Sequence, residues 1–166
     1  MRSSRIARLA LVLAAVSTGV CAPMPVSAAG CTVCICGMST TALSFGTYNP
    51  SSSTARTATA TVSVNCISIT LPINTAVDLS LSAGTSGTAA AREMANGTAR
   101  LGYNIFQDAG HATIWGNGSN GGQAQSLSIT NSLNYTANRT AYGRIPANQY
   151  VSTGSYTDPI IVTFTF

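Results

Sequence analysis

The stretch that decides the fold is DPIIVTFTF, residues 158–166. Large apolar side chains recur there at every second position. Successive side chains of a β-strand point to opposite faces of the sheet, so a period of two places one set of residues on one face. That set is Ile160, Val162, Phe164 and Phe166. We therefore expect a strand whose apolar face lines a core.

The same period of two recurs upstream in short stretches that are separated by Gly, Ser and Asn turns. These stretches are TATATVSVNC (57–66), AVDLSLS (76–82), ARLGYNIF (99–106) and AQSLSIT (124–130). HATIWG (111–116) follows a Gly-containing turn and is expected to form a hairpin with the third stretch. TAAAREMANG (88–97) is expected to be an irregular connection. Charged residues make up only 7% of the chain, and the Glu, Lys and Leu that surface helices prefer are scarce. The sequence thus predicts an all-β, antiparallel β-sandwich.

The beginning of the sequence predicts a secretory signal peptide. Arg2, Arg5 and Arg8 precede the apolar run Leu9–Val20, and small residues follow before an expected cleavage after Ala28 or Ala29. The run is too short for a stable membrane anchor. We expect residues 1–29 to be the signal peptide and residues 30–166 to form one domain, with no membrane span after cleavage.

The charge balance argues against a nucleic-acid partner. The chain has 8 Lys+Arg against 4 Asp+Glu, a net charge of +4, and every basic residue is an arginine. Three of the arginines lie in the predicted signal peptide, so the rest of the chain is close to neutral. A basic face for nucleic acid is therefore not expected.

Four cysteines remain after the predicted cleavage: Cys31, Cys34, Cys36 and Cys66. An even number in an oxidising compartment suggests disulfides, and three connectivities are possible. Cys34 and Cys36 share a face of the expected strand and are poorly placed to bond each other. We expect a bridge from Cys66 to Cys36 or to Cys34. A redox role for CTVC lacks the βαβ context, and a zinc site is disfavoured because His111 is the one histidine available.

One motif suggests a nucleotide site. Gly116, Gly118 and Gly121 have the spacing G-x-G-x-x-G of dinucleotide-binding loops. That chemistry needs a helix whose N-terminus holds the pyrophosphate. The residues that follow, QAQSLSIT, alternate as a strand instead. We expect a Gly/Asn loop between antiparallel strands, and neither a nucleotide nor another cofactor.

Catalytic patterns are weak as well. His111 has no evident triad partner, and the nucleophile elbow G-x-S-x-G is absent from the sequence. Asp108 and Asp158 occupy turn positions, where such side chains bond their own backbone. The sequence therefore predicts no enzyme and no metal site.

Several segments, in their order and spacing, resemble the spore coat protein U domain family, which includes subunits of archaic chaperone–usher pili. They are CICGMSTTALSFGTYNP (34–50), VSVNC (62–66), AREM (91–94), LGYNIFQDAGHATIWG (101–116) and YGRIPANQYVSTGSYTDPIIVTFTF (142–166). The resemblance implies an immunoglobulin-like, pilin-type sandwich that lacks one strand. A periplasmic chaperone fills the resulting groove first, and the N-terminal segment of the next subunit fills it later, at the usher.

We place the partner edge implied by this resemblance at the last stretch, with Ile160, Val162, Phe164 and Phe166 lining the groove. Cys31 follows the expected cleavage site almost directly, so the chain is expected to accept a donor strand without offering a separate one. The predicted function is a secreted structural or adhesive subunit that passes through the periplasm to the cell surface or a pilus. The alternative is a stand-alone secreted module with a complete sandwich, which binds a carbohydrate or a surface through Trp115, Tyr142 and the Gly/Asn loop.

Overall fold

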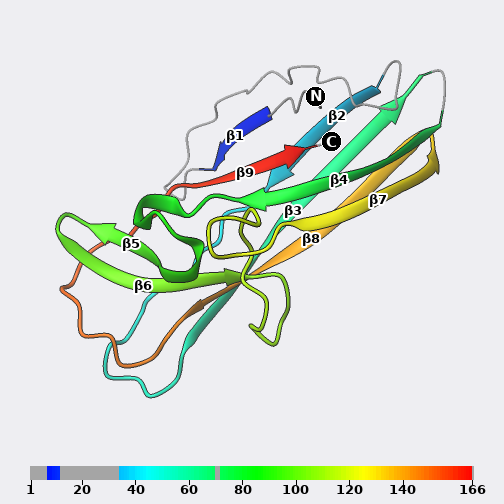
Figure 1. Ribbon diagram of the computed structural model, residues 1–166. Coiled ribbons are helices and arrows are strands. Elements are labelled where there is room, and N and C mark those ends of the chain that lie inside the picture. The colour runs from blue at the N-terminus through cyan, green and yellow to red at the C-terminus, as the bar shows by residue number, and fades with distance from the viewer. Residues whose placement is uncertain (1–6, 12–33, 70–71, 166) are drawn as a thin grey trace.

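The structure is a computed structural model, and it describes residues 7–11, 34–69 and 72–165 (Figure 1). Within these ranges the chain forms nine β-strands and two short 3-10 helices. The strands are β1 (Ala7–Leu11), β2 (Cys34–Thr40), β3 (Arg56–Ser68), β4 (Ile73–Leu81), β5 (Arg92–Asn96), β6 (Ala99–Phe106), β7 (Gln125–Ser132), β8 (Asn134–Ile145) and β9 (Ile160–Thr165). The 3-10 helices are η1 (Gly84–Ser86) and η2 (Ala89–Ala91).

The strands form two antiparallel sheets that face each other across one core (Figure 1). One sheet has the order β1-β9-β4-β7, and the other has the order β2-β3-β8-β6-β5. Strands that are neighbours in a sheet are mostly distant in the sequence, so the contacts that hold the sheets together are long-range. The all-β antiparallel sandwich predicted from the sequence is confirmed.

Strand β3 shows why the alternating stretches became strands. Val62, Val64 and Cys66 are buried between the sheets, whereas Ser63 and Asn65 lie on the outer face. The strand pairs with β8 along nearly its whole length, and on its other side it pairs with β2 from Val62 to Ser68. Stretches 76–82, 99–106 and 124–130 lie largely within β4, β6 and β7.

Strand β8 was not predicted, because several of its inward positions carry small side chains in place of large apolar ones. Ala141 and Gly143 are buried, and the Leu43–Phe45 segment packs over them. A Cβ atom at Gly143 would lie 2.7 Å from Cζ of Phe45. The small residues let other parts of the chain pack close to the β8 backbone. The strand therefore lacks the large apolar residues by which a core strand is normally recognised in a sequence.

Two local expectations need correction. Residues 88–97 are not an irregular connection: they form η2 followed by β5, which pairs with β6. Residues 111–116 turn back along β6 as expected, but they form isolated bridges and no regular strand. The N–H of Trp115 donates to the carbonyl of Ile105, and the N–H of Gln107 donates to that of Thr113, each at 2.9 Å.

In the described part of the chain, no helix has both the length and the apolar composition needed to cross a bilayer.

Candidate functional site at the edge of strand β9

Strand β9 carries the apolar face that the sequence predicted. The side chains of Ile160 and Val162 are 1% exposed and that of Phe164 is 7% exposed. Ile161 and Thr163 are half-buried on the outer face. Phe166, the fourth predicted member of this face, lies outside the described residues.

The backbone of β9 has two sides with different partners. On one side β9 pairs with β4, from Val162 opposite Leu81 to Thr165 opposite Asp78. At the start of the strand, the N–H of Ser82 donates to the carbonyl of Ile161, and the N–H of Ile161 donates to Oγ of Ser82, each at 2.9 Å.

Backbone groups of successive residues in a strand point to opposite sides. Because the groups of Ile161 face β4, the N–H and C=O groups of Ile160, Val162 and Phe164 face away from β4. We call this side the β9 edge.

Strand β1 lies along the β9 edge (Figure 1). The two strands are antiparallel, and Leu11, Leu9 and Ala7 are the register partners of the three edge residues of β9 in chain order. β1 consists of residues 7–11, which fall inside the segment 1–29 that the sequence predicts to be a signal peptide. The edge is thus paired in the full chain by a strand that lies outside the predicted domain 30–166.

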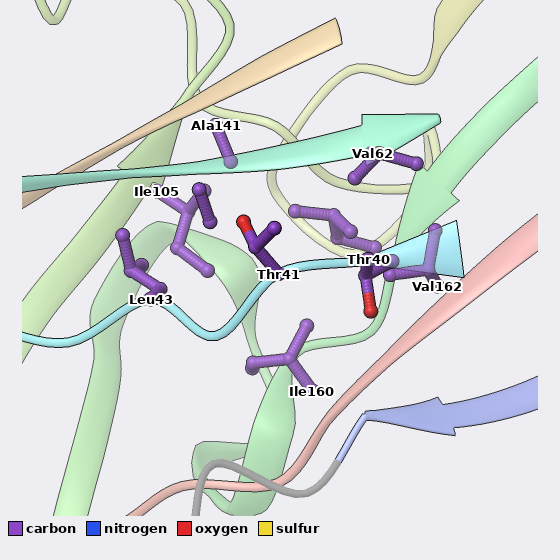
Figure 2. Close-up of a pocket in the computed structure, with 10 residues that line it drawn as sticks. Thr40, Thr41, Leu43, Val62, Ile105, Ala141, Ile160 and Val162 are labelled. Atoms are coloured by element: carbon purple, nitrogen blue, oxygen red, sulfur yellow. The ribbon is translucent and has the colours of Figure 1, made fainter. Parts of the chain in front are cut away.

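A small cavity of about 20 Å³ lies inside the sandwich next to β9 (Figure 2). Ile160 and Val162 of β9 line it from one side, and Thr40 and Thr41 line it where β2 ends. The remaining lining residues are Leu43, Ala60, Val62, Leu81, Ile105 and Ala141. A space of this size accepts a methyl group or one water molecule. The core is therefore incompletely filled beside β9.

A buried arginine fixes the region from which β9 starts. Arg92 is fully buried, and one of its guanidinium nitrogens, Nη2, donates to the carbonyls of Ser82 at 2.6 Å and Trp115 at 2.8 Å. Nη1 donates to Oδ1 of Asn104 at 3.0 Å. Burial lowers the pKa of Arg92, while the nearby Tyr103 and Asp158 oppose that shift. The guanidinium joins the end of β4 to β6 and to the turn after it.

Asp158 lies two residues before β9 and is buried as well, with 1% exposure. Its Oδ2 accepts a hydrogen bond from the hydroxyl of Tyr103 at 2.8 Å, and its Oδ1 accepts one from the N–H of Thr85 at 2.9 Å. Burial and the Asp158 carboxylate raise the pKa of Tyr103 above its ordinary range. The expectation that Asp158 is a turn residue bonding its own backbone was wrong. We call Arg92, Tyr103 and Asp158 the polar corner.

The disulfide joins β2 to β3. Cys36 and Cys66 are register partners, with Cα atoms 4.1 Å apart, and they form a disulfide bridge. This is one of the two pairings that the sequence left open. Cys34 is also disulfide-bonded, and Cys31 lies outside the described residues. The bridge holds β2, the edge strand of the second sheet, onto β3.

The glycine motif forms a loop whose polar groups are taken up by hydrogen bonds within the protein. The N–H of Gly118 donates to the carbonyl of Gly122 at 2.8 Å, and Nδ2 of Asn120 donates to the carbonyl of Leu81 at 3.0 Å. Gly118 and Gly121 have positive φ angles of 88° and 87°, which glycine tolerates. The loop does not join an antiparallel pair as expected: β7 pairs with β4, and the bridge from Trp115 to Gln123 is parallel.

The other candidate residues, Trp115, Tyr142 and His111, are packed into the fold. Trp115 is fully buried and its Nε1 donates to the carbonyl of Leu79 at 3.0 Å, so it is not an exposed platform for a sugar. Tyr142 is half-buried in β8. His111 packs edge-on against Phe106.

Asp108 behaves as the sequence predicted, because its carboxylate accepts hydrogen bonds from the N–H groups of Thr113 and Ala112. These hydrogen bonds, that of Thr113 above all, lower the pKa of Asp108. Among the described residues, no three His, Cys, Asp or Glu side chains gather as a metal site would require.

Comparison with known proteins adds a family and a fold. The profile of the Spore Coat Protein U domain family matches residues 20–163. A similar fold occurs in the crystal structure of the CsuC–CsuE chaperone–tip adhesion subunit pre-assembly complex from archaic chaperone–usher Csu pili of Acinetobacter baumannii. The TM-score is 0.55 at 19% sequence identity, covering 81% of this chain and 40% of the matched chain. No curated protein matches the sequence.

The structural likeness agrees with the immunoglobulin-like, pilin-type sandwich that the sequence predicted. The present chain spans less than half the length of the chain it matches.

Proposed function

Because the chain belongs to the Spore Coat Protein U domain family, we propose that it is a secreted structural subunit of a surface pilus. A partner's β-strand would add to the β9 edge. On this proposal the chain passes through the periplasm with a chaperone, reaches an usher and joins neighbouring subunits at the cell surface, where it contributes to adhesion. It performs no catalysis.

One observation carries the proposal: the strand that covers the β9 edge belongs to the predicted signal peptide. Cleavage after Ala28 or Ala29 removes β1 from the domain. The backbone groups of Ile160, Val162 and Phe164 then lose their strand partner. Unpaired backbone groups beside an apolar core are costly, and such an edge favours the addition of a strand from another chain.

The side chains beside this edge favour an apolar partner strand. Ile160, Val162 and Phe164 present a continuous apolar face, and the cavity next to Ile160 and Val162 leaves room for a further small group. Burying one large apolar side chain of a partner contributes about 1.5–3 kcal/mol. Two or three such side chains are comparable to the whole stability of a small domain. A subunit without its partner strand would therefore be unstable or oligomeric.

The fold likeness supports the choice of a chaperone as the first partner. The similar crystal structure contains a chaperone in complex with a pilus tip subunit. A periplasmic chaperone that supplies a strand would protect the β9 edge between cleavage of the signal peptide and assembly at the usher.

The experiment compares two adjacent substitutions of the same kind. The chain is co-expressed with candidate periplasmic chaperones, and the complex is recovered from the periplasm and weighed by native mass spectrometry. Ile160→Asp places a charge on the apolar face, whereas Ile161→Asp places the same charge on the outer face. We expect a one-to-one complex for the unchanged chain and for Ile161→Asp, and none for Ile160→Asp.

Hydrogen exchange on the unchanged chain supplies the decisive control. If the amides of Ile160, Val162 and Phe164 are fully protected in an isolated, cleaved monomer, the sandwich is complete without a partner. Strand addition at this edge would then be refuted.

A further inference from the structure

We infer that residues 7–11 act as an intramolecular capping strand, so that a chain retaining its predicted signal peptide cannot accept a partner strand at the β9 edge. The inference rests on the proposed function for the role of this edge. It adds a regulatory step: cleavage removes the chain's own strand as well as its export signal.

The register of β1 supports this assignment. Residues directly opposite each other in an antiparallel pair lie on the same face of the sheet. Leu9 is opposite Val162 and Leu11 is opposite Ile160, so both leucines occupy register positions of the core face. Arg8 is opposite Thr163, a position on the outer face. By register, the apolar residues of the segment are therefore opposite core-face positions of β9, and its arginine is opposite an outer-face position.

The chemistry of the segment serves two purposes with the same residues. A signal peptide needs an arginine-rich start followed by an apolar run. A strand that fills a half-open sandwich needs apolar residues at every second position. The sequence RLALVL, beginning at Arg8, meets both requirements because Leu9, Leu11 and Leu13 recur with a period of two within the apolar run.

Covalent attachment makes the cap hard to displace. Residues 12–33 connect β1 to β2, so pairing with β9 is intramolecular. Short connections give an effective concentration on the order of millimolar. A partner strand binds only the fraction of molecules with an open edge, and its apparent affinity falls by that fraction. After cleavage the cap becomes a separate peptide at low concentration, and the edge becomes available.

The test uses the full chain, residues 1–166, refolded from denaturant under oxidising conditions so that no signal peptidase acts on it. Leu9→Asp introduces a carboxylate at a core-face position of β1, and Ala10→Asp introduces the same group at the neighbouring outer-face position. Residue-resolved hydrogen exchange is followed at Ile160, Val162 and Phe164, whose N–H groups face β1.

We expect Leu9→Asp to accelerate exchange at these three amides by about tenfold or more, because local opening governs exchange at an edge. The amides of Ile161 and Thr163 face β4 and should stay protected. Ala10→Asp should resemble the unchanged chain at all five positions. Unchanged exchange at the edge amides in Leu9→Asp would overturn the inference. If Ile161 and Thr163 also exchange fast, the chain has unfolded, and the milder Leu9→Ala takes the place of the first variant under the same criteria.

A peptide measurement provides a second readout. The probe is a labelled synthetic peptide with the sequence of residues 5–15, RIARLALVLAA. It should bind the Leu9→Asp chain at least about tenfold more tightly than the unchanged chain, in which the cap competes. Equal binding to both would contradict intramolecular capping.

The two proposals fail separately. If Leu9→Asp opens the edge and the peptide binds, but no periplasmic chaperone is captured by the cleaved chain, self-capping stands and the pilus function falls. The opposite outcome is that the cleaved chain captures a chaperone, but Leu9→Asp does not change hydrogen exchange at the β9 edge of the full chain. Self-capping would then be refuted, and the pilus function would stand.

Discussion

Two neighbouring regions hold strand β9 in place by different means. At its start, the polar corner and Ser82 fix the chain through hydrogen bonds between named atoms, including those to Ile161 and Asp158. Along its length, the β9 edge is held by backbone pairing to β1 and by an apolar face. The first set of contacts depends on particular side chains at particular positions. The second can be made by any apolar strand of suitable register.

This difference separates folding from assembly. A domain that must receive a foreign strand needs an acceptor that stays in position while its edge is empty. The polar corner provides such an anchor, because in the described part of the chain its hydrogen bonds reach Ser82 after β4, strand β6 and the segment before β9, and none of them reaches β1. The disulfide has a similar effect on the opposite sheet, where it holds edge strand β2 onto β3.

The largest expected effect comes from breaking the corner. Arg92→Met removes the charged donors to the carbonyls of Ser82 and Trp115 and to Oδ1 of Asn104, so these acceptors lose their partner inside the core. Leaving a buried acceptor without its charged donor costs about 1–3 kcal/mol for each acceptor. Arg100 is exposed and bonds only local carbonyls, so Arg100→Met is the matched control with little expected effect. Urea unfolding of the refolded full chain measures both, and similar losses for the two variants would contradict a special role of the corner.

The next effect tests the anchor of the opposite sheet, where the disulfide holds edge strand β2 onto β3. Replacing both Cys36 and Cys66 by alanine removes a bridge that spans a sequence separation of 30. In the chain-entropy account this costs about 3–4 kcal/mol. We expect a lower periplasmic yield and a lower urea midpoint. Added chaperone should not restore either of them fully. Peptide mapping that finds Cys66 as a free thiol in the native protein would refute the assignment.

How much of this was accessible from sequence depended on the kind of signal. Strands β3, β4 and β9 were predictable because valine, leucine, isoleucine and phenylalanine recur at every second position. Strand β8 was not, because Ala141 and Gly143 fill inward positions where close packing over Phe45 and Leu43 needs small residues.

The parts of the site that depend on distant contacts were harder to predict. Asp158 precedes a proline and looks like a turn residue, and its partners Tyr103 and Thr85 are 55 and 73 positions away in the chain. The pairing of residues 7–11 with β9 was missed for a different reason. An apolar run after arginines is explained in full by a signal peptide, so its period of two does not by itself predict a strand.

The smallest expected effect is the pH dependence of the stability that the Tyr103 hydroxyl contributes to the polar corner. Tyr103→Phe removes the hydroxyl that donates to Asp158, and a buried carboxylate that loses a donor costs about 1–3 kcal/mol near neutral pH. Because the folded state raises the pKa of Tyr103, the unchanged protein holds this tyrosine neutral at a pH where the unfolded chain would ionise it. The contribution of the neutral Tyr103 to the free energy of unfolding is therefore complete below about pH 10, the ordinary tyrosine pKa. This contribution declines as the pH rises further.

Phenylalanine cannot ionise, so the stability difference between the unchanged chain and Tyr103→Phe should narrow above pH 10. Tyr150 is 79% exposed, and Tyr150→Phe is the matched control with little difference at any pH. Urea unfolding at intervals from pH 7 to the alkaline limit measures this trend. A difference that stays constant through that range would mean that folding does not shift the pKa of Tyr103, and the corner would then not stabilise the neutral hydroxyl over its ionised form.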